Sequence, residues 1–133
     1  MSFKLDSRLD QDGIFVRDLK LSQLRIMNHQ NFPWLILVSK KDDLIELTDL
    51  NDQEYMVLTQ EIRTVSLMMQ TLFKPDKLNI ATIGNVVSQL HIHIIARYRD
   101  DKLFPKPVWG GAFIPYEEET LTSLLSSLNS QSL

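Results

Sequence analysis

The sequence of 133 residues contains no cysteine. Disulfide bonds, cysteine-ligated zinc sites, iron–sulfur clusters and cysteine nucleophiles are therefore excluded. An excess of positive charge is also missing, because 17 Asp and Glu outnumber 14 Lys and Arg and leave a formal net charge of −3. This balance argues against a general nucleic-acid-binding protein, which needs a basic patch. No run reaches the roughly 18 apolar residues of a membrane helix, so we expect no membrane partner.

The overall composition is that of an ordinary soluble globular protein, with 44% hydrophobic and 23% charged residues. A chain of this length is typical of one domain, which we expect to span residues 1–133. The first nine residues lack the apolar stretch of a secretory signal, and we therefore expect a cytoplasmic location.

The hydrophobic pattern predicts an α+β fold with an antiparallel sheet of about five strands. The expected strands cover residues 14–16, 24–28, 34–38, 77–83 and 87–97. One long helix should begin after the N-cap Asn51, with Glu54 completing a capping box, and should end near Phe73, before Pro75. Three glutamates, 117–119, favour the start of a C-terminal helix, because the helix dipole attracts acidic residues there. Strands 77–83 and 87–97 follow each other closely and should be antiparallel neighbours.

Histidine is scarce, and only His29, His91 and His93 are present. In a strand over 87–97, alternate side chains point to opposite faces, so Gln89, His91 and His93 would share one face. The apolar residues between them would anchor the strand on the core. The two histidine Cα atoms would lie roughly 6.6 Å apart, so both side chains could converge on one small group.

Three interpretations of the histidine pair remain open at this point. Both rings could be structural and pair with polar groups on a half-buried sheet. They could bind a metal ion, although such a site needs a third ligand and no nearby Asp or Glu is an obvious donor. Finally, one neutral imidazole could attack a phosphorus atom while the other hydrogen-bonds the phosphoryl oxygens.

The run Gln89-Leu90-His91-Ile92-His93-Ile94-Ile95, preceded by Gly84-Asn85, resembles the motif of the histidine triad (HIT) family. That family carries three alternating histidines at the end of its sheet, and the order of strands and long helix is also similar. The resemblance covers roughly residues 14–100, with the motif region at 84–97 and a C-terminal extension at 101–133. Bacterial HIT-like proteins regarded as dinucleoside polyphosphate hydrolases are the most similar.

The resemblance implies a catalytic group of three residues. His91 matches the family's nucleophile, which attacks the α-phosphorus of a nucleotide and carries a nucleotidyl intermediate that water hydrolyses. His93 matches the histidine that helps to bind the phosphate. Gln89 stands in place of the first histidine, and it can exchange hydrogen bonds but cannot take up a proton near neutral pH.

The resemblance also implies the substrate-binding residues and the partners. Asn28 matches the residue that binds the ribose, and Asn85 and Asn79 match polar positions near the phosphate. The expected activity is a hydrolase or nucleotidyl transferase acting on a dinucleoside polyphosphate or a nucleoside phosphoramidate. We expect no cofactor and assign no metal-ligating residue, and the family resemblance implies a homodimer. The alternative is a nucleotide-binding module with little or no catalysis, because the first histidine is replaced by Gln89.

Three residues outside the motif could also contribute to a site. We expect His29, next to Asn28, to be a surface residue, and Arg97 to be solvated or to form a salt bridge. Trp109 lies in a connection rich in Pro and Gly, where it could cover a nucleotide base, pack on a partner subunit or pack on its own domain.

Overall fold

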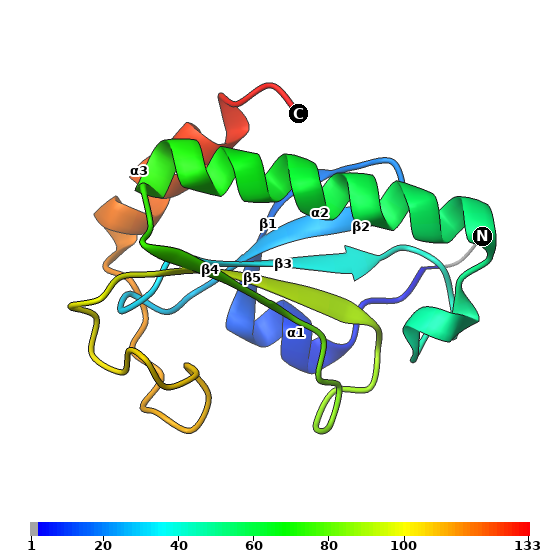
Figure 1. The fold of residues 1–133 in the computed structure, drawn as a ribbon, viewed down its shortest axis with the longest axis horizontal. Coiled ribbons are helices and arrows are strands. Elements are labelled where there is room, and N and C mark those ends of the chain that lie inside the picture. The colour runs from blue at the N-terminus through cyan, green and yellow to red at the C-terminus, as the bar shows by residue number, and fades with distance from the viewer. Residues whose placement is uncertain (1–2) are drawn as a thin grey trace.

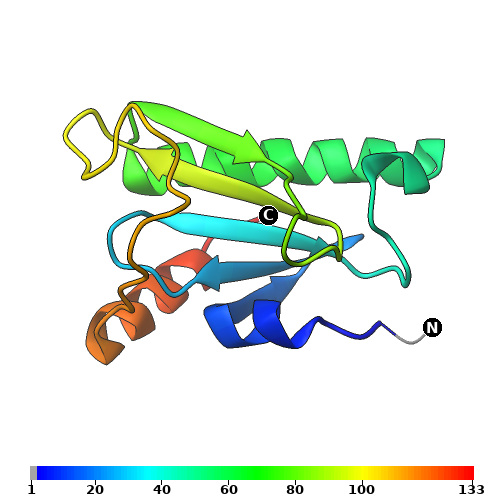
Figure 2. The same ribbon diagram turned by 90° about the horizontal axis from the view of Figure 1, so that it is seen from below.

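Five strands form one antiparallel sheet in the computed structural model, which describes residues 3–133. Their order across the sheet is β1-β2-β3-β5-β4, and Figure 2 shows β4 at one edge and β1 at the other. The strands are β1 (Gly13–Asp18), β2 (Ser22–Met27), β3 (Trp34–Ser39), β4 (Lys77–Ala81) and β5 (His91–Arg97). The predicted α+β fold with an antiparallel sheet is therefore confirmed. Met1 and Ser2, which the predicted domain includes, lie outside the described residues.

Helix α2 (Asp52–Phe73) forms where the sequence pattern predicts it. The side chain of Asn51 accepts a hydrogen bond from the Glu54 backbone N–H, and Glu54 accepts one in return from the Asn51 N–H, each at 2.8 Å. This capping box satisfies two backbone groups that the first turn leaves free. Lys74 adopts the left-handed conformation and Pro75 follows, so the helix ends here.

Helix α2 lies across one face of the sheet, and α3 (Glu118–Asn129) packs on the same side (Figure 1). The stripe of Leu58, Val65 and Met69 is buried against the sheet, where Leu90, Ile92 and Ile94 form part of the same core cluster. This cluster anchors β5 from the side opposite to its histidines. A short 3₁₀ helix, η1 (Leu47–Asp49), precedes α2.

The other face of the sheet is covered by the short helix α1 (Ser7–Asp12) and by the connection between β5 and α3 (Figure 1). Helix α1 was not predicted, because its six residues carry only one buried apolar side chain, Leu9. A second apolar cluster lies on this face, made of Leu9, Met27, Phe32, Trp34, Ile36, Val38, Ile95 and Val108. All six residues of β3 are buried, as the apolar run at 34–38 predicts for a strand covered on both sides.

The motif strand is shorter than the predicted range of 87–97, because β5 begins at His91. Its pairing with β3 starts at His91, opposite Val38, and its pairing with β4 starts at His93, opposite Ala81. Residues before His91 therefore have no strand beside them, and the Leu90 N–H donates instead to the Leu44 carbonyl. The predicted range for β5 was wrong at this end, and Gln89 lies outside the strand.

Arg97, at the end of β5, is fully buried, so the solvated role that the sequence left open is wrong and the salt bridge holds. Its Nε and Nη2 donate to the two carboxylate oxygens of Asp101 at 2.8 and 3.0 Å, and its Nη1 donates to Oδ1 of Asn79 at 2.9 Å. The guanidinium carbon lies 5.3 Å from the Phe32 ring centre and 5.6 Å from that of Phe104. Such contacts stabilise a buried cation.

Helices that could cross a membrane are not found in the described part of the chain, since none of them is both long and apolar enough.

Candidate active site

His91 and His93 lie side by side on the face of β5 that points away from α2, as strand alternation predicts. Their ring centres are 4.8 Å apart, and each residue is only 6% exposed. The chemistry of each ring depends on which of its nitrogens is available, because a neutral imidazole has one donor and one acceptor.

The ring of His91 is oriented by a backbone carbonyl. Its Nδ1 lies 2.6 Å from the carbonyl oxygen of Gln89. A carbonyl can only accept, so Nδ1 carries the proton and the lone pair of the neutral ring is on Nε2. No hydrogen bond to this Nε2 is made by any of residues 3–133. His91 therefore offers a free nucleophilic nitrogen.

The ring of His93 is held in the opposite tautomer. The indole Nε1–H of Trp34 donates to its Nδ1 at 3.0 Å, so the proton of the neutral ring is on Nε2. Burial, with a smaller contribution from the nearby His91, lowers the pKa of His93 to about 3. His93 is thus neutral at physiological pH and offers an N–H donor beside the lone pair of His91.

Both rings line a cavity of about 310 Å³, close to the lower limit for small-molecule sites. Its wall is largely aromatic and aliphatic, with Trp34, Trp109, Phe113, Met27 and Val108 among the lining residues. Trp109 meets the rings of Trp34 and His93 edge-on, with centre distances of 5.7 and 5.1 Å. Trp109 is still 39% exposed. It therefore packs on its own domain and also lines the cavity, where its ring remains accessible.

His29 also lines this cavity and is only 4% exposed, so the expectation of a surface residue was wrong. It packs against Trp34, Phe32 and Phe113, with ring centres 5.1–6.0 Å away. Burial lowers its pKa, which favours the neutral ring. The turn that follows β2 brings it under the connection that carries Phe113, and this non-local packing is absent from the sequence pattern.

The loop between β4 and β5 forms another wall of the cavity. Gly84 has a φ of 72°, a backbone conformation that residues with a side chain rarely adopt. This turn directs Asn85, Val86 and Val87 to the cavity. Asn85 thus lines the same cavity as the two histidines. It is the one predicted substrate-binding asparagine that the structure places in the cavity wall.

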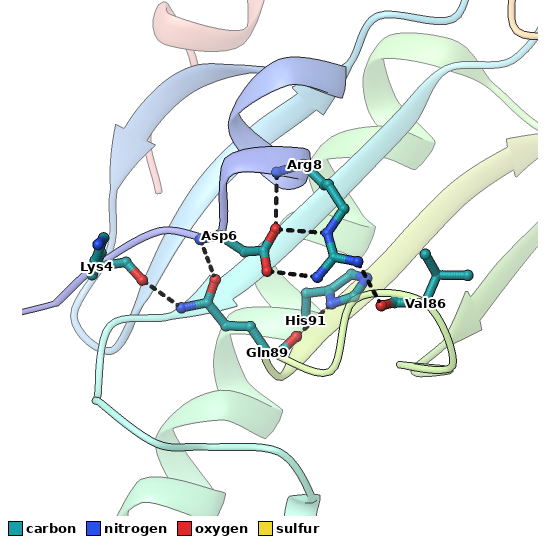
Figure 3. Close-up of polar contacts among 6 residues, drawn as sticks. All are labelled: Lys4, Asp6, Arg8, Val86, Gln89 and His91. Carbon is teal, nitrogen blue, oxygen red and sulfur yellow. Dashed lines mark hydrogen bonds and ion pairs between the residues drawn. The ribbon is translucent and has the colours of Figure 1, made fainter.

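The other predicted site residues are engaged outside the lining of this cavity. The Oδ1 of Asn28 accepts a hydrogen bond from the Tyr116 N–H, and that of Asn79 accepts from Arg97. Gln89 precedes the strand, and its side chain is turned towards the N-terminal residues Lys4 and Asp6 (Figure 3). It therefore does not share the face of His91 and His93, as the longer strand would have required.

A metal centre lacks ligands in the described residues, 3–133, because no three His, Asp or Glu side chains lie close enough to hold an ion. Nδ1 of both motif histidines is already used, towards a carbonyl and an indole. The pair is better described as one acceptor and one donor facing a common cavity.

Comparison with known proteins shows the family. A family model described as the HIT domain matches residues 8–100. The chain belongs to the histidine triad (HIT) family. Among curated proteins the search found no match.

Solved structures of other HIT proteins superpose closely. A histidine triad protein from Bradyrhizobium japonicum is 40% identical, with a TM-score of 0.93 and 96% of each chain covered. One from Sinorhizobium meliloti is 39% identical, with a TM-score of 0.93 and coverage of 96% of this chain and 95% of that one. The diadenosine triphosphate hydrolase of Plasmodium falciparum shares the fold at 20% identity, with a TM-score of 0.67 over 97% of this chain and 81% of its own.

Two functional features of this HIT protein were missed from the sequence. Trp34 starts β3 on the face that carries His93, and the register pairs Ile36 with His93. A predicted antiparallel pairing of these two strands would have placed the indole near that ring. The N-terminal residues that contact Gln89 had no such signal, because they are far away in sequence and irregular in pattern.

Proposed function

We propose that this HIT protein is a nucleotide hydrolase or nucleotidyl transferase that cleaves at an α-phosphate through a nucleotidyl–His91 intermediate. The observation that carries the proposal is the pair of opposite tautomers, with a lone pair on Nε2 of His91 beside an N–H on Nε2 of His93. A phosphoryl group needs both, a nucleophile for phosphorus and a donor for its oxygens.

The reaction proceeds in two displacements. Nε2 of His91 attacks the α-phosphorus, the bond between phosphorus and the leaving group breaks, and that group departs with the electron pair. The ring is then a cation whose Nδ1–H remains bonded to the Gln89 carbonyl, which stabilises the charge. Water attacks the same phosphorus and the phosphorus–nitrogen bond breaks, with its electron pair returning to Nε2 of His91. A nucleoside monophosphate leaves, and the surplus proton of the water passes to solvent. During both steps the Nε2–H of His93 donates to a phosphoryl oxygen.

The cavity wall suits the rest of a nucleotide. Trp109 and Phe113 offer apolar ring surfaces on which a base can stack, and both are partly exposed. Asn85 supplies an amide near the phosphate position. The class of substrate we propose is a dinucleoside polyphosphate or a nucleoside phosphoramidate.

Mass spectrometry of a trapped adduct tests this proposal. Incubation with a fluorogenic nucleoside phosphoramidate, followed by denaturing quenching and peptide mapping at alkaline pH, which preserves a phosphorus–nitrogen bond, should place a nucleotidyl group on His91. His91→Ala should lower kcat by on the order of 10³-fold or more and abolish the adduct. His93→Asn is the matched variant, and it should slow turnover while the adduct still forms on His91. A nucleotidyl group on another residue, or full turnover in His91→Ala, would contradict the proposal.

A second candidate is a nucleotide-binding module with little catalysis. It is favoured by the position of Gln89, whose side chain is turned away from the cavity and leaves only two imidazoles on β5. Calorimetry that detects nucleoside monophosphate binding, with no turnover of diadenosine polyphosphates or phosphoramidates, would select this function instead.

We also propose a homodimer, formed along β4. Within residues 3–133 this strand pairs with β5 only, so one side of it is open to a second copy. Ile80 on β4 and Tyr55 and Met56 on α2 are 47–57% exposed, and Ile80 and Tyr55 line one groove, so these apolar side chains could be covered by a second copy. Light scattering on the purified protein decides between one copy and two.

A further inference from the structure

The side chain of Gln89 makes two hydrogen bonds to the N-terminal segment, defined here as residues 4–8 (Figure 3). Its Oε1 accepts from the Asp6 backbone N–H at 2.8 Å, and its Nε2 donates to the Lys4 carbonyl at 2.9 Å. One acceptor and one donor thus meet backbone groups two residues apart, as a neighbouring strand would. The primary amide of glutamine carries its donor and its acceptor on one carbon and can direct both at this segment, whereas the donor and acceptor nitrogens of an imidazole point in diverging directions.

The same residue orients the proposed nucleophile from its other side. The carbonyl oxygen of Gln89 is the group that lies 2.6 Å from Nδ1 of His91. The hydrogen bonds of its side-chain amide to Lys4 and Asp6 therefore restrain Gln89, and the carbonyl of this residue selects the tautomer of His91. Fixing this carbonyl matters, because a free neutral imidazole exchanges its proton between both nitrogens.

Arg8 provides a second attachment between the N-terminal segment and the loop before β5. Its Nη1 donates to the Val86 carbonyl at 3.0 Å. Its Nε and Nη2 donate to the two carboxylate oxygens of Asp6 at 3.1 and 3.0 Å, and these bonds hold the guanidinium in place. The hydrogen bonds from Arg8 lower the pKa of Asp6, so this carboxylate stays charged near neutral pH.

The N-terminal segment is also tied to the core by apolar contacts. Leu9, directly after it, is 5% exposed, lines the cavity and belongs to the apolar cluster on this face of the sheet. Leu5 packs against the same cluster. The segment is therefore a fixed support on which the polar contacts of Gln89 and Arg8 can act.

From these contacts we propose that Gln89 is a positioning residue, with Arg8 as a second one. The hydrogen bonds from the N-terminal segment to the Gln89 side-chain amide hold Gln89 in place, so that its carbonyl keeps His91 with the Nε2 lone pair towards the cavity. The inference rests on the proposed function for its effect on turnover, but not for its effect on the His91 ring. It assigns Gln89 a role that acts through His91, rather than a direct contact with substrate in place of a histidine.

Nitrogen NMR of the histidine rings, combined with kinetics, tests the inference. In the unaltered protein the signals of His91 should report a proton on Nδ1. Gln89→Ala and Gln89→His should both shift part of the population to the Nε2–H form and expose the Asp6 amide to hydrogen exchange. Both should lower kcat on a nucleoside phosphoramidate by about tenfold, with KM changed less than about twofold, because orientation and not binding is lost. Arg8→Ala should act in the same direction with a smaller loss.

Arg17→Ala is the matched control for Arg8→Ala. Arg17 also donates from Nη1 to a backbone carbonyl at 3.0 Å, but that carbonyl belongs to Gln131 and not to the loop before β5. Its removal should change neither the His91 ring signals nor kcat. Thermal melting of every variant checks that the fold is retained.

Two results would overturn the inference. One is an unchanged His91 tautomer in Gln89→Ala while the Asp6 amide is released. The other is a higher kcat in Gln89→His, which would mean that this position acts on the substrate. If the unaltered protein turns over no nucleotide substrate, the proposed function fails, but the ring signals still decide whether Gln89 positions His91.

Discussion

The two ends of strand β5 place buried polar side chains on the same face of the sheet, yet they use them differently. Arg97 at one end is enclosed by Asp101, Asn79 and two aromatic rings. At the other end, His91 and His93 each use one ring nitrogen for a contact within the protein. The second nitrogen of each ring has no hydrogen-bond partner among residues 3–133, and both rings line a cavity.

This difference shows why burial by itself does not identify a functional residue. Arg97 is more deeply buried than either histidine, at 0% exposure against 6%. Its charge is matched by Asp101, so its contribution is to stability and to the course of the chain after β5. The histidines differ because they retain one acceptor and one donor that point to the same space.

The largest expected effect is at the arginine end. Asp101→Ala should lower the free energy of unfolding by about 3–5 kcal/mol, because it leaves the buried charge of Arg97 without its partner. It also removes the acceptor for the backbone N–H groups of Tyr98, Leu103 and Phe104. Urea denaturation measures the loss. A change below about 1 kcal/mol would show that this end is not the structural one.

A smaller effect, confined to a range of pH, is expected at the histidine end. Burial lowers the pKa of His93 to about 3, against an ordinary value of 6.5. The unfolded chain therefore takes up a proton below pH 6.5 that the folded chain refuses, and stability falls as the pH drops from 6.5 towards 3. His93→Asn should flatten this dependence in urea titrations, because an amide does not take up a proton in this range. The amide can still accept the hydrogen bond from Trp34, so the packing is kept.

Two other groups serve as internal references for that pH series. His29→Asn should remove a further part of the slope in the same window, because the pKa of His29 is lowered as well, mainly by burial. Burial raises the pKa of Asp101, but its hydrogen bonds with Arg97 and the backbone outweigh this and hold it well below its ordinary value of 3.8. The stability that Asp101 contributes is therefore lost only as the pH falls below its ordinary pKa of 3.8. Equal slopes in the unaltered protein and in His93→Asn would contradict the assignment.

The smallest effect is expected for Asn79, which the family resemblance linked to the phosphate and the structure places beside Arg97. Asn79→Ala should cost about 1.5–3 kcal/mol of stability, the usual value for a hydrogen bond to a charged group. Calorimetric affinity for a nucleoside monophosphate should remain unchanged. A weakened affinity with normal stability would show that Asn79 contributes to nucleotide binding and not to the contacts of Arg97.

Most of the fold could be predicted because its signals are local. The capping box at Asn51 and Glu54, the apolar stripe of α2 and the apolar run in β3 each depend on neighbouring residues. The start of β5 was missed because it depends on where the partner strands β3 and β4 stop. Helix α1 was missed because it is short and gains its stability from packing under the sheet.

The candidate site was predictable where alternation along one strand decides the outcome, as for His91 and His93. It was not predictable where a partner comes from elsewhere in the chain. Trp34 selects the tautomer of His93 from β3, and His29 is buried by the connection before α3. For Gln89, sequence position suggested a neighbour of the histidines, whereas its actual partners are the backbone of Lys4 and Asp6.

The attachment of Gln89 to Lys4 also sets an order in time. The two residues are 85 positions apart, so during synthesis the first emerges on the order of ten seconds before the second. Through this interval Leu5 and Leu9 have neither β5 nor its preceding loop to pack beside. We therefore expect the surroundings of His91 to be among the last parts of the molecule to become ordered, after the β1–β2 hairpin, which needs only neighbouring residues.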